Sequence, residues 1–282
     1  MPANPTVGAT VDGWIRHFAS ADRELLWMAA EEELSIPLMP GVILAGRVDA
    51  RGVAMQHGFF GEWKTMARYS ASGWREKWRM HPQSLTYGLL LSETHPEIDR
   101  FTIRVALKTD PPTFDHEWFN YSAAEVQEWR GEVERIANEI GELIRAGYWA
   151  HNPADKWHWP LNPLSCYKWG PKYPCPYVYA CSHQEWSQKQ PQAPLPYIPH
   201  LQVMRDAAAQ PTPPLVLDAT AITTYLECPE SFRRRYIRGE DEPPSEALVF
   251  GSQFHAALDN YYKQLVAGSQ FATEGAAKWP NH

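Results

Sequence analysis

The amino-acid sequence predicts an α/β fold in which a central layer of strands lies between layers of helices. Residues 122–146 place apolar side chains three or four positions apart, which is the period of an amphipathic helix. Residues 41–49 and 101–107 are short, rich in apolar and β-branched residues and typical of strands. Helical and extended segments alternate along the chain, and 44% hydrophobic residues are enough for a substantial core.

The first third of the chain is expected to hold a helix followed by strands. Apolar residues between positions 11 and 34 keep a helical period, so we predict a helix over 11–34. Strands are predicted, with turns at Pro40-Gly41 and Arg51-Gly52, over 36–38, 41–49 and 58–64.

The middle of the chain continues the alternation. A helix is predicted over 81–91, with Pro82 in its first turn, and a strand over 101–107. The clearest helix, over 122–146, has acidic residues early and Arg145 late, which complements the helix dipole.

The chain is expected to be organised in three segments. Residues 1–183 form the core and end in a Cys-containing stretch expected to be irregular, and residues 184–216 form a proline-rich linker. Residues 217–282 are expected to form helices, over 218–238 and 245–266, that pack on the same core.

The composition excludes several classes of protein. The net charge of −7 argues against nucleic-acid binding through bulk positive charge, although it allows a local basic groove. Four cysteines are too few for a disulfide-rich secreted scaffold. Without an apolar run of about 20 residues or a signal-peptide core, we expect an intracellular, cytoplasmic protein with no membrane partner. The oligomeric state is left open.

Three polar residues on two predicted strands form the most informative cluster. Glu62 and Lys64 share one face of their strand because strand side chains alternate, and pairing with the preceding strand would bring Asp49 beside Glu62. Two carboxylates at one place favour a hard divalent cation. The alternative is a cross-strand salt bridge on a solvated face.

These residues carry a family resemblance. The segments concerned are Gly46-Arg47-Val48-Asp49, Glu62-Trp63-Lys64-Thr65 and Gln83-Ser84-Leu85-Thr86-Tyr87. Their order and spacing resemble the PD-(D/E)XK nuclease superfamily, in its RecB-like branch. The resemblance implies a restriction-endonuclease-like core, with a mixed central sheet flanked by helices and a Cys-rich subdomain.

The resemblance also implies site residues and an activity. Asp49 and Glu62 would bind Mg²⁺ or Mn²⁺, Lys64 would be the catalytic lysine, and Gln83 and Tyr87, one helical turn apart, would steady the site or the DNA. The implied activity is a metal-dependent deoxyribonuclease acting on single-stranded or double-stranded DNA. Endonuclease and exonuclease action both remain open.

The family's opening motifs are found near the C-terminus instead of before Asp49. The segments Cys228-Pro229-Glu230-Ser231-Phe232 and Gly251-Ser252-Gln253-Phe254-His255 resemble them. A circular permutation would account for this order, with His255 completing the metal site in space. A truncated tandem repeat and a swap with a second molecule are the alternatives.

All four cysteines fit one metal centre. Cys175 and Cys181 are separated by five residues, Cys166 precedes them, and Cys228 lies in the relocated opening motif. Similarity to AddB-type and CRISPR-adaptation nucleases implies a [4Fe-4S] cluster on these cysteines. A zinc ion and unliganded thiols are the alternatives.

A basic run follows Cys228 and is the expected DNA contact. Its members are Arg233, Arg234, Arg235 and Arg238. Arginines in such a run suit phosphate contacts, whereas the alternative is a solvated basic helix face. Two other functions stay open for the chain: a non-catalytic DNA-binding or assembly subunit, and a zinc-stabilised scaffold. A phage origin is among the sources that the resemblance allows.

Overall fold

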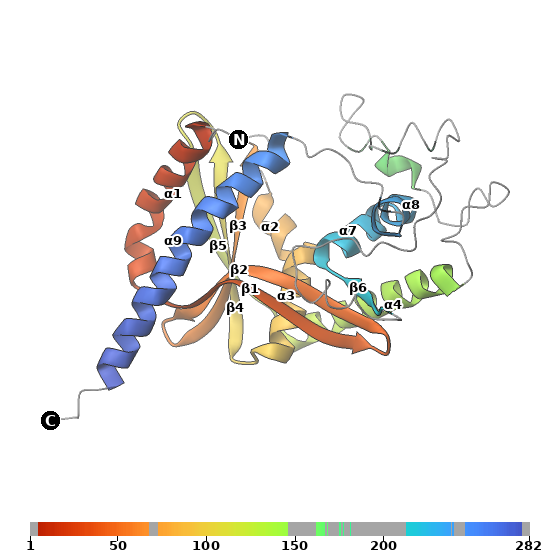
Figure 1. The fold of residues 1–282 in the computed structure, drawn as a ribbon, viewed down its shortest axis with the longest axis horizontal. Helices are drawn as coiled ribbons and strands as arrows, with labels where there is room; N and C mark the ends of the chain where they lie inside the picture. The colour runs from red at the N-terminus through yellow and green to blue at the C-terminus, as the bar shows by residue number, and fades with distance from the viewer. Residues whose placement is uncertain are drawn as a thin grey trace. The chain divides into compact units, whose positions relative to one another are not determined.

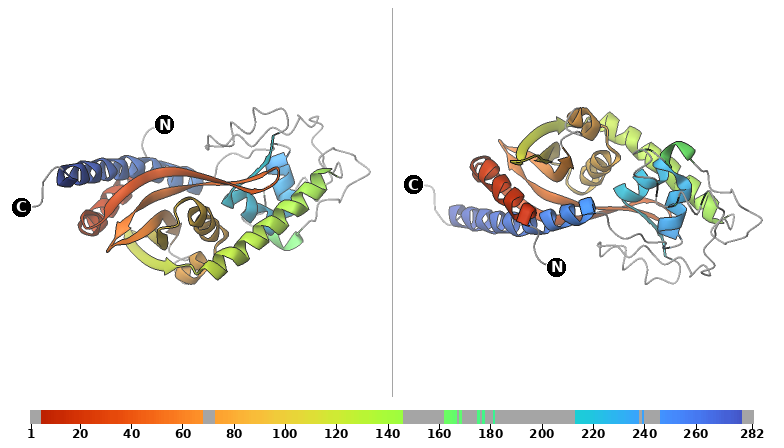
Figure 2. Two further views of the ribbon diagram at one scale, coloured as in Figure 1. Left: turned by 90° about the horizontal axis from the view of Figure 1, so that it is seen from below. Right: turned by 90° about the horizontal axis from the view of Figure 1, so that it is seen from above.

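The computed structural model divides the chain into two compact units. The residues it describes are 5–67, 73–145, 162–166, Lys168, Cys175, Tyr177, Cys181, 213–237, Gly239 and 246–277. Unit 1 comprises residues 1–34, 47–126 and 244–282, and unit 2 comprises residues 35–46 and 127–243. Figures 1 and 2 show the ribbon from three directions. Most of the proline-rich linker predicted over 184–216, as far as residue 212, lies outside the described residues.

The described strands form one mixed sheet. They are β1 (Leu26–Met39), β2 (Val42–Ala54), β3 (His57–Ala67), β4 (Ile98–Lys108), β5 (Thr113–Asn120) and β6 (Leu215–Leu217). Their order is β1-β2-β3-β4-β5, with β6 parallel to the start of β2. β2 and β3 are antiparallel, as are β4 and β5, whereas β3 and β4 are parallel.

The helices precede, connect and follow these strands. They are α1 (Pro5–Arg23), α2 (Trp74–Arg79), α3 (Pro82–Thr94), α4 (Ala123–Arg145), η2 (Pro163–Ser165), α7 (Ala219–Glu227), α8 (Pro229–Phe232), the π-helical turn η3 (Arg233–Ile237) and α9 (Glu246–Ala277). α2 and α3 form the crossover that the parallel pair β3 and β4 requires. Among the described residues, no helix is both long enough and apolar enough to cross a membrane.

The predicted α/β class is confirmed, because helices flank both faces of the sheet within unit 1. On one face of β3, Trp63 packs against Trp14 of α1 and Tyr262 of α9. On the other face, Phe60 packs against Tyr87 of α3. The architecture is consistent with the restriction-endonuclease-like core that the family resemblance implies.

Two expectations for the first third of the chain are wrong. The helix predicted over 11–34 ends at Arg23, because β1 begins at Leu26 and buries alternate side chains from Leu34 onward. The turn predicted at Arg51-Gly52 is part of β2. A Cβ on Gly52 would lie 2.6 Å from the Leu26 backbone oxygen, so this glycine allows close strand contact instead of a turn.

The later elements agree with the sequence more closely. α3 covers the helix predicted over 81–91, β4 covers the strand over 101–107, and α4 covers the helix over 122–146. The helix predicted over 218–238 is interrupted at Cys228, which is extended because it precedes Pro229. The strand β5 and the helix α2 were not predicted.

Aromatic side chains dominate the core of unit 1. Trp14, Trp27 and Trp63 are almost fully buried and pack together with Phe254 and Tyr262 of α9. Gly61 makes room for the Trp63 ring, since a Cβ there would lie 2.5 Å from it. These three tryptophans therefore serve packing in this unit. They also attach α9 to α1 and the sheet.

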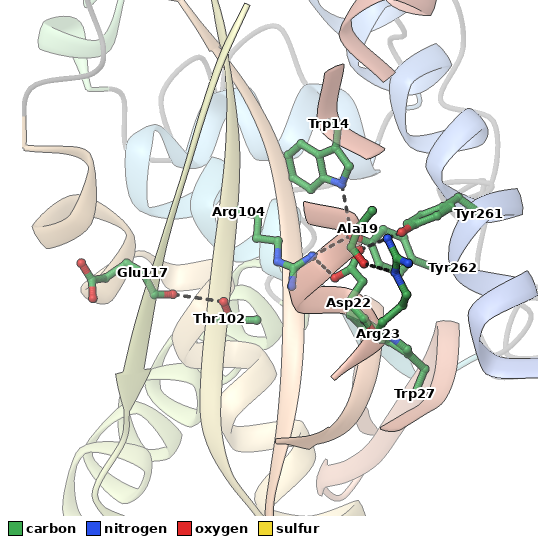
Figure 3. A network of polar contacts seen from close by, with 10 residues as sticks. All are labelled: Trp14, Ala19, Asp22, Arg23, Trp27, Thr102, Arg104, Glu117, Tyr261 and Tyr262. Carbon is green, nitrogen blue, oxygen red and sulfur yellow. Dashed lines mark hydrogen bonds and ion pairs between the residues drawn. The ribbon is translucent and has the colours of Figure 1, made fainter. Parts of the chain in front are cut away.

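A buried polar network crosses this aromatic core (Figure 3). Arg104 of β4 pairs with Asp22 of α1, with 2.5 Å between Nη1 and Oδ1, and donates to the Tyr262 hydroxyl at 3.0 Å. The same hydroxyl accepts a hydrogen bond from the Trp14 indole at 3.1 Å, and the Tyr261 hydroxyl donates to Asp22 at 3.1 Å. These polar contacts thus join α9 to α1 and β4, in addition to the aromatic packing.

Candidate metal-binding site

The pairing of β2 with β3 brings two acidic side chains together in unit 1. Ala50 lies opposite Gly61 in this antiparallel pair. Asp49 and Glu62 are the neighbouring residues on the two strands, one before Ala50 and one after Gly61. The Asp49 Oδ2 atom accepts a hydrogen bond of 2.5 Å from the backbone N–H of Trp63. This bond fixes the carboxylate and leaves its Oδ1 atom available. The strand pairing on which the sequence analysis made this site conditional is therefore present.

Lys64 lies on the same face of β3 as Glu62. Its Nζ atom forms an ion pair with Glu62 Oε1 and lies 5.1 Å from the centre of the Trp78 ring. The lysine side chain keeps about a fifth of its surface exposed, whereas Glu62 is buried. Lys64 can therefore reach a solvent-side ligand while it remains tied to the acidic pair.

α3 adds an amide to the site. The Gln83 Nε2 atom donates to Glu62 Oε1 at 2.8 Å and to the Tyr87 hydroxyl at 3.0 Å, as two residues one helical turn apart can. The helix begins there because His81 caps it through a 3.2 Å bond to the Gln83 N–H, with Pro82 at the first position. Gln83 thus holds one oxygen of Glu62 in place.

His255 reaches the site from α9. Its Nδ1 atom lies 3.4 Å from Asp49 Oδ1. The preceding Phe254 is fully buried and packs on Trp14, which sets the rotation of the helix. The structure therefore brings together Asp49, Glu62, Lys64, Gln83, Tyr87 and His255.

The charges at the site perturb one another. Burial raises the pKa of Glu62 to about 7, and the nearby negative charge of Asp49 adds to this shift. Burial also disfavours the charged form of Asp49, but His255 and Lys64 outweigh it and lower the pKa of this carboxyl. The pKa of His255 is raised, because the Asp49 carboxylate outweighs the effect of burial. Near neutral pH the ion-free site thus retains protons that a cation could displace.

Glu31 also belongs to this site and was not predicted. One carboxylate oxygen of Glu31, one of Asp49 and one ring nitrogen of His255 lie within 4.8 Å of one another. The sequence analysis placed Glu31 at the charged end of a helix, whereas it lies in β1 with a positive φ of 52°. The apolar alternation at Leu34, Ile36 and Leu38 could have indicated the strand, but extended backward it reaches Glu32 and does not identify Glu31.

The four cysteines lie in unit 2. The backbone N–H of Cys175 donates to the carbonyl of Cys166 at 2.6 Å, and Cys228 is the buried residue between α7 and α8. Burial raises the pKa of the Cys181 thiol to about 11, and the charges of Cys175 and Cys228 contribute to that shift. Burial and the charge of Cys228 also raise the pKa of Cys166. None of these four described cysteines forms a disulfide.

The basic run after Cys228 differs from the expectation. Arg233 and Arg234 are buried and both bind Glu230, at 2.7 Å and 2.9 Å. We therefore correct their assignment as DNA contacts, because a buried guanidinium with a carboxylate partner is not presented to a phosphate. Arg235 is partly exposed, and Arg238 lies outside the described residues.

Comparison with models of protein families places part of the chain. Residues 217–281 match the profile of the PD-(D/E)XK nuclease superfamily. The matched segment contains Cys228 and His255, whereas Asp49, Glu62 and Lys64 precede it. A search of curated proteins finds no match to the chain.

Proposed function

We propose that this protein is a divalent-metal-dependent DNA nuclease of the PD-(D/E)XK type. The observation that carries the proposal is the 3.4 Å approach of His255 to Asp49, beside Glu62 and Lys64. His255 lies in the segment that matches the superfamily, and the other three lie in strands outside it. Their convergence supplies the acids, the lysine and the histidine that such a site needs.

The donor atoms fit Mg²⁺ or Mn²⁺. Glu62 Oε2 is buried and has no hydrogen-bond partner among the described residues, which is costly unless a ligand occupies it. Asp49 Oδ1 and His255 Nδ1 face the same site. Oxygen and imidazole donors without any thiolate suit a hard or intermediate cation. Asp49, Glu62 and His255 would hold the ion.

The protein's own residues then have distinct roles in phosphodiester hydrolysis. A bound divalent ion supplies Lewis acidity and neutralises charge on the phosphate. Lys64 donates from the same face and stabilises negative charge that develops on the phosphate oxygens. Gln83 keeps Glu62 Oε1 occupied, so that Oε2 is the oxygen offered to the ion. Tyr87 in turn orients Gln83.

A cleavage assay tests this proposal. The wild-type protein should cut linear and circular DNA only with Mg²⁺ or Mn²⁺. Asp49→Ala and Lys64→Ala should each reduce the rate by about 100-fold or more, as the loss of a transition-state contact does. Lys77→Ala, which removes an exposed lysine from α2, is the matched control and should cut normally.

Two outcomes would contradict the proposal. Wild-type rates for either site variant would exclude these residues from catalysis. DNA binding without cleavage by the wild-type protein would indicate a non-catalytic subunit instead. Single-stranded and double-stranded substrates, each with free or blocked ends, separate exonuclease from endonuclease action.

We further propose that the chain is a circularly permuted member of the RecB-like branch. The superfamily match at residues 217–281 contains Cys228 and His255, whose segments resemble the motifs that the branch places first. The strands with Asp49 and Glu62 come earlier in this chain. The segment over 1–183 would be the original second part, and the linker over 184–216 would join it to 217–282. Closeness of His255 to Asp49 within one chain supports this arrangement.

We also propose that Cys166, Cys175, Cys181 and Cys228 bind a structural [4Fe-4S] cluster. The charges of Cys175 and Cys228 act on the Cys181 thiol, and the charge of Cys228 also acts on Cys166, so the four thiols influence one another. Four thiolates suit a [4Fe-4S] cluster, and a tetrahedral zinc ion is the alternative.

The positive charge of Arg234 supports the same proposal. Arg234 is 1% exposed, and its charge acts on the Cys181 thiol. Four thiolates make a cluster site strongly negative, and a buried guanidinium offsets part of that charge. For the DNA contact we retain Arg235, which is partly exposed, and Arg238.

A further inference from the structure

Glu31 is an acid at the metal-binding site that the proposed mechanism does not use. One carboxylate oxygen of Glu31, one of Asp49 and one ring nitrogen of His255 all lie within 4.8 Å of one another. Octahedral Mg²⁺ has bonds of about 2.1 Å, so opposite ligand atoms lie about 4.2 Å apart. The three donors therefore need only a small contraction to share one ion.

Two neighbouring carboxylates, those of Asp49 and Glu62, support a cation at this site. Asp49 uses Oδ2 for the Trp63 N–H, which leaves Oδ1 facing His255. Glu62 is 3% exposed, and its Oε2 atom has no hydrogen-bond partner among the described residues. A buried carboxylate oxygen without a partner is a strong sign of a missing ligand beside the cluster.

A competing role for Glu31 is structural. Its Oε2 atom lies 3.0 Å from Arg47 Nε, in an ion pair between β1 and β2. The Arg47 side chain is about one-third exposed, so this pair is a weak source of stability and can open toward solvent. An ion pair of this kind does not explain why the Glu31 carboxylate also approaches Asp49, which carries the same charge.

We infer that Glu31 is a direct ligand of the divalent ion, together with Asp49 and His255. The inference rests on the proposed metal centre and deepens it, because it adds a carboxylate from β1 to the donors of β2, β3 and α9. With Glu62, the site then offers three carboxylates and one imidazole. Such a set favours Mn²⁺ and Mg²⁺, which prefer oxygen donors.

Mn²⁺ binding tests the inference without any DNA. The full-length protein is stripped with a chelator and titrated with Mn²⁺, and the electron paramagnetic resonance signal of free Mn²⁺ reports the bound fraction. Glu31→Gln should weaken Mn²⁺ binding by about tenfold or more, since even indirect partners of a metal site contribute that much. Glu31→Asp, which keeps the charge, should weaken it less.

Two control variants separate the metal role from the structural one. Glu32→Gln removes the neighbouring acid of β1, which pairs with Arg51 at 2.6 Å, and should bind Mn²⁺ like the wild type. Arg47→Gln breaks the ion pair with Glu31 but keeps the carboxylate, so it should also keep Mn²⁺ binding. If Arg47→Gln loses affinity as Glu31→Gln does, the role of Glu31 is structural and the inference is wrong.

Mn²⁺ binding by Asp49→Asn shows whether a failure concerns Glu31 alone or the whole proposed metal centre. Wild-type Mn²⁺ binding by both Glu31→Gln and Glu31→Asp, with loss of binding in Asp49→Asn, overturns the role of Glu31 alone. Undiminished binding in Asp49→Asn overturns the metal centre itself. Circular dichroism of each ion-free variant verifies that it is folded, and Gln and Asp are close enough in shape to Glu to preserve the packing of β1.

Discussion

His255 Nδ1 lies 3.4 Å from Asp49 Oδ1, although the two residues come from opposite ends of the chain. This contact depends on how α9 is fastened to the rest of unit 1. The Phe254 ring packs against Trp14 of α1, whose indole also donates a hydrogen bond to the Tyr262 hydroxyl. Figure 1 shows α1 and α9 side by side. Packing on the far side of the sheet thus determines the geometry of the polar site.

Replacement of Arg104 should destabilise unit 1 strongly. Arg104→Met leaves the Asp22 carboxylate buried without its cation, and loss of one partner of a buried pair costs about 3–5 kcal/mol. Urea unfolding monitored by tryptophan fluorescence measures the change. Arg135→Met is the matched control: its ion pairs with Glu132 and Glu139 are exposed, so a loss below about 1 kcal/mol is expected. Equal losses for the two variants would contradict this explanation.

The sequence was sufficient where the structure depends on local geometry. The common face of Glu62 and Lys64 follows from the two-residue period of a strand, and Gln83 and Tyr87 follow from the helical turn. These relationships need no knowledge of distant contacts. The sequence analysis left the pairing of Asp49 with Glu62 conditional, and it placed the turn at Arg51-Gly52 although the strands turn at Met55-Gln56.

The sequence was not sufficient where a distant contact or an interruption of strand alternation determines the structure. Glu31 follows a run that fits helix and strand alike, and its positive φ interrupts the alternation that would identify β1. The burial of Arg233 and Arg234 depends on Glu230, three and four residues earlier, which turns an apparent basic surface into an internal ion pair. Charge alone predicts exposure unless such a partner is considered.

The stability of the ion-free protein should fall as the pH rises from about 5 to about 8. Burial raises the pKa of Glu62 and of Glu31 to about 7, so the folded state holds more protons than the unfolded state above pH 4.5. The raised pKa of His255 acts in the same direction. Urea unfolding in the presence of a chelator measures the trend.

Glu62→Gln isolates the contribution of the site from that of the remaining ionisable groups. The glutamine side chain at position 62 does not titrate, so the unfolding free energy of this variant should depend less steeply on pH than that of the wild type. Mn²⁺ should restore the stability of the wild type at pH 8, because the ion replaces the lost protons. A variant slope equal to that of the wild type would exclude Glu62 as the titrating group.

Protein purified without oxygen should be brown and should contain about four irons per chain. Cys228→Ser should lose colour and iron, because the proposed cluster would lose one of its four thiolate ligands. Iron analysis and the visible spectrum measure both. Asp49→Asn is the control and should keep its iron, since Asp49 belongs to the other site. A colourless wild-type protein with one zinc ion would contradict the cluster.

A mixing experiment distinguishes permutation within one chain from a swap between two chains. Asp49→Ala and His255→Ala each inactivate the site by removing a different ligand. If both ligands of a site come from one chain, an equal mixture of the two variants, unfolded and refolded together, stays inactive. In a swapped dimer, pairs of different variants would instead assemble some sites with both ligands intact. We expect no recovery of cleavage, because Asp49 and His255 meet within a single chain. Wild-type protein refolded with an equal amount of Asp49→Ala should keep about half the activity, which verifies that refolding succeeds.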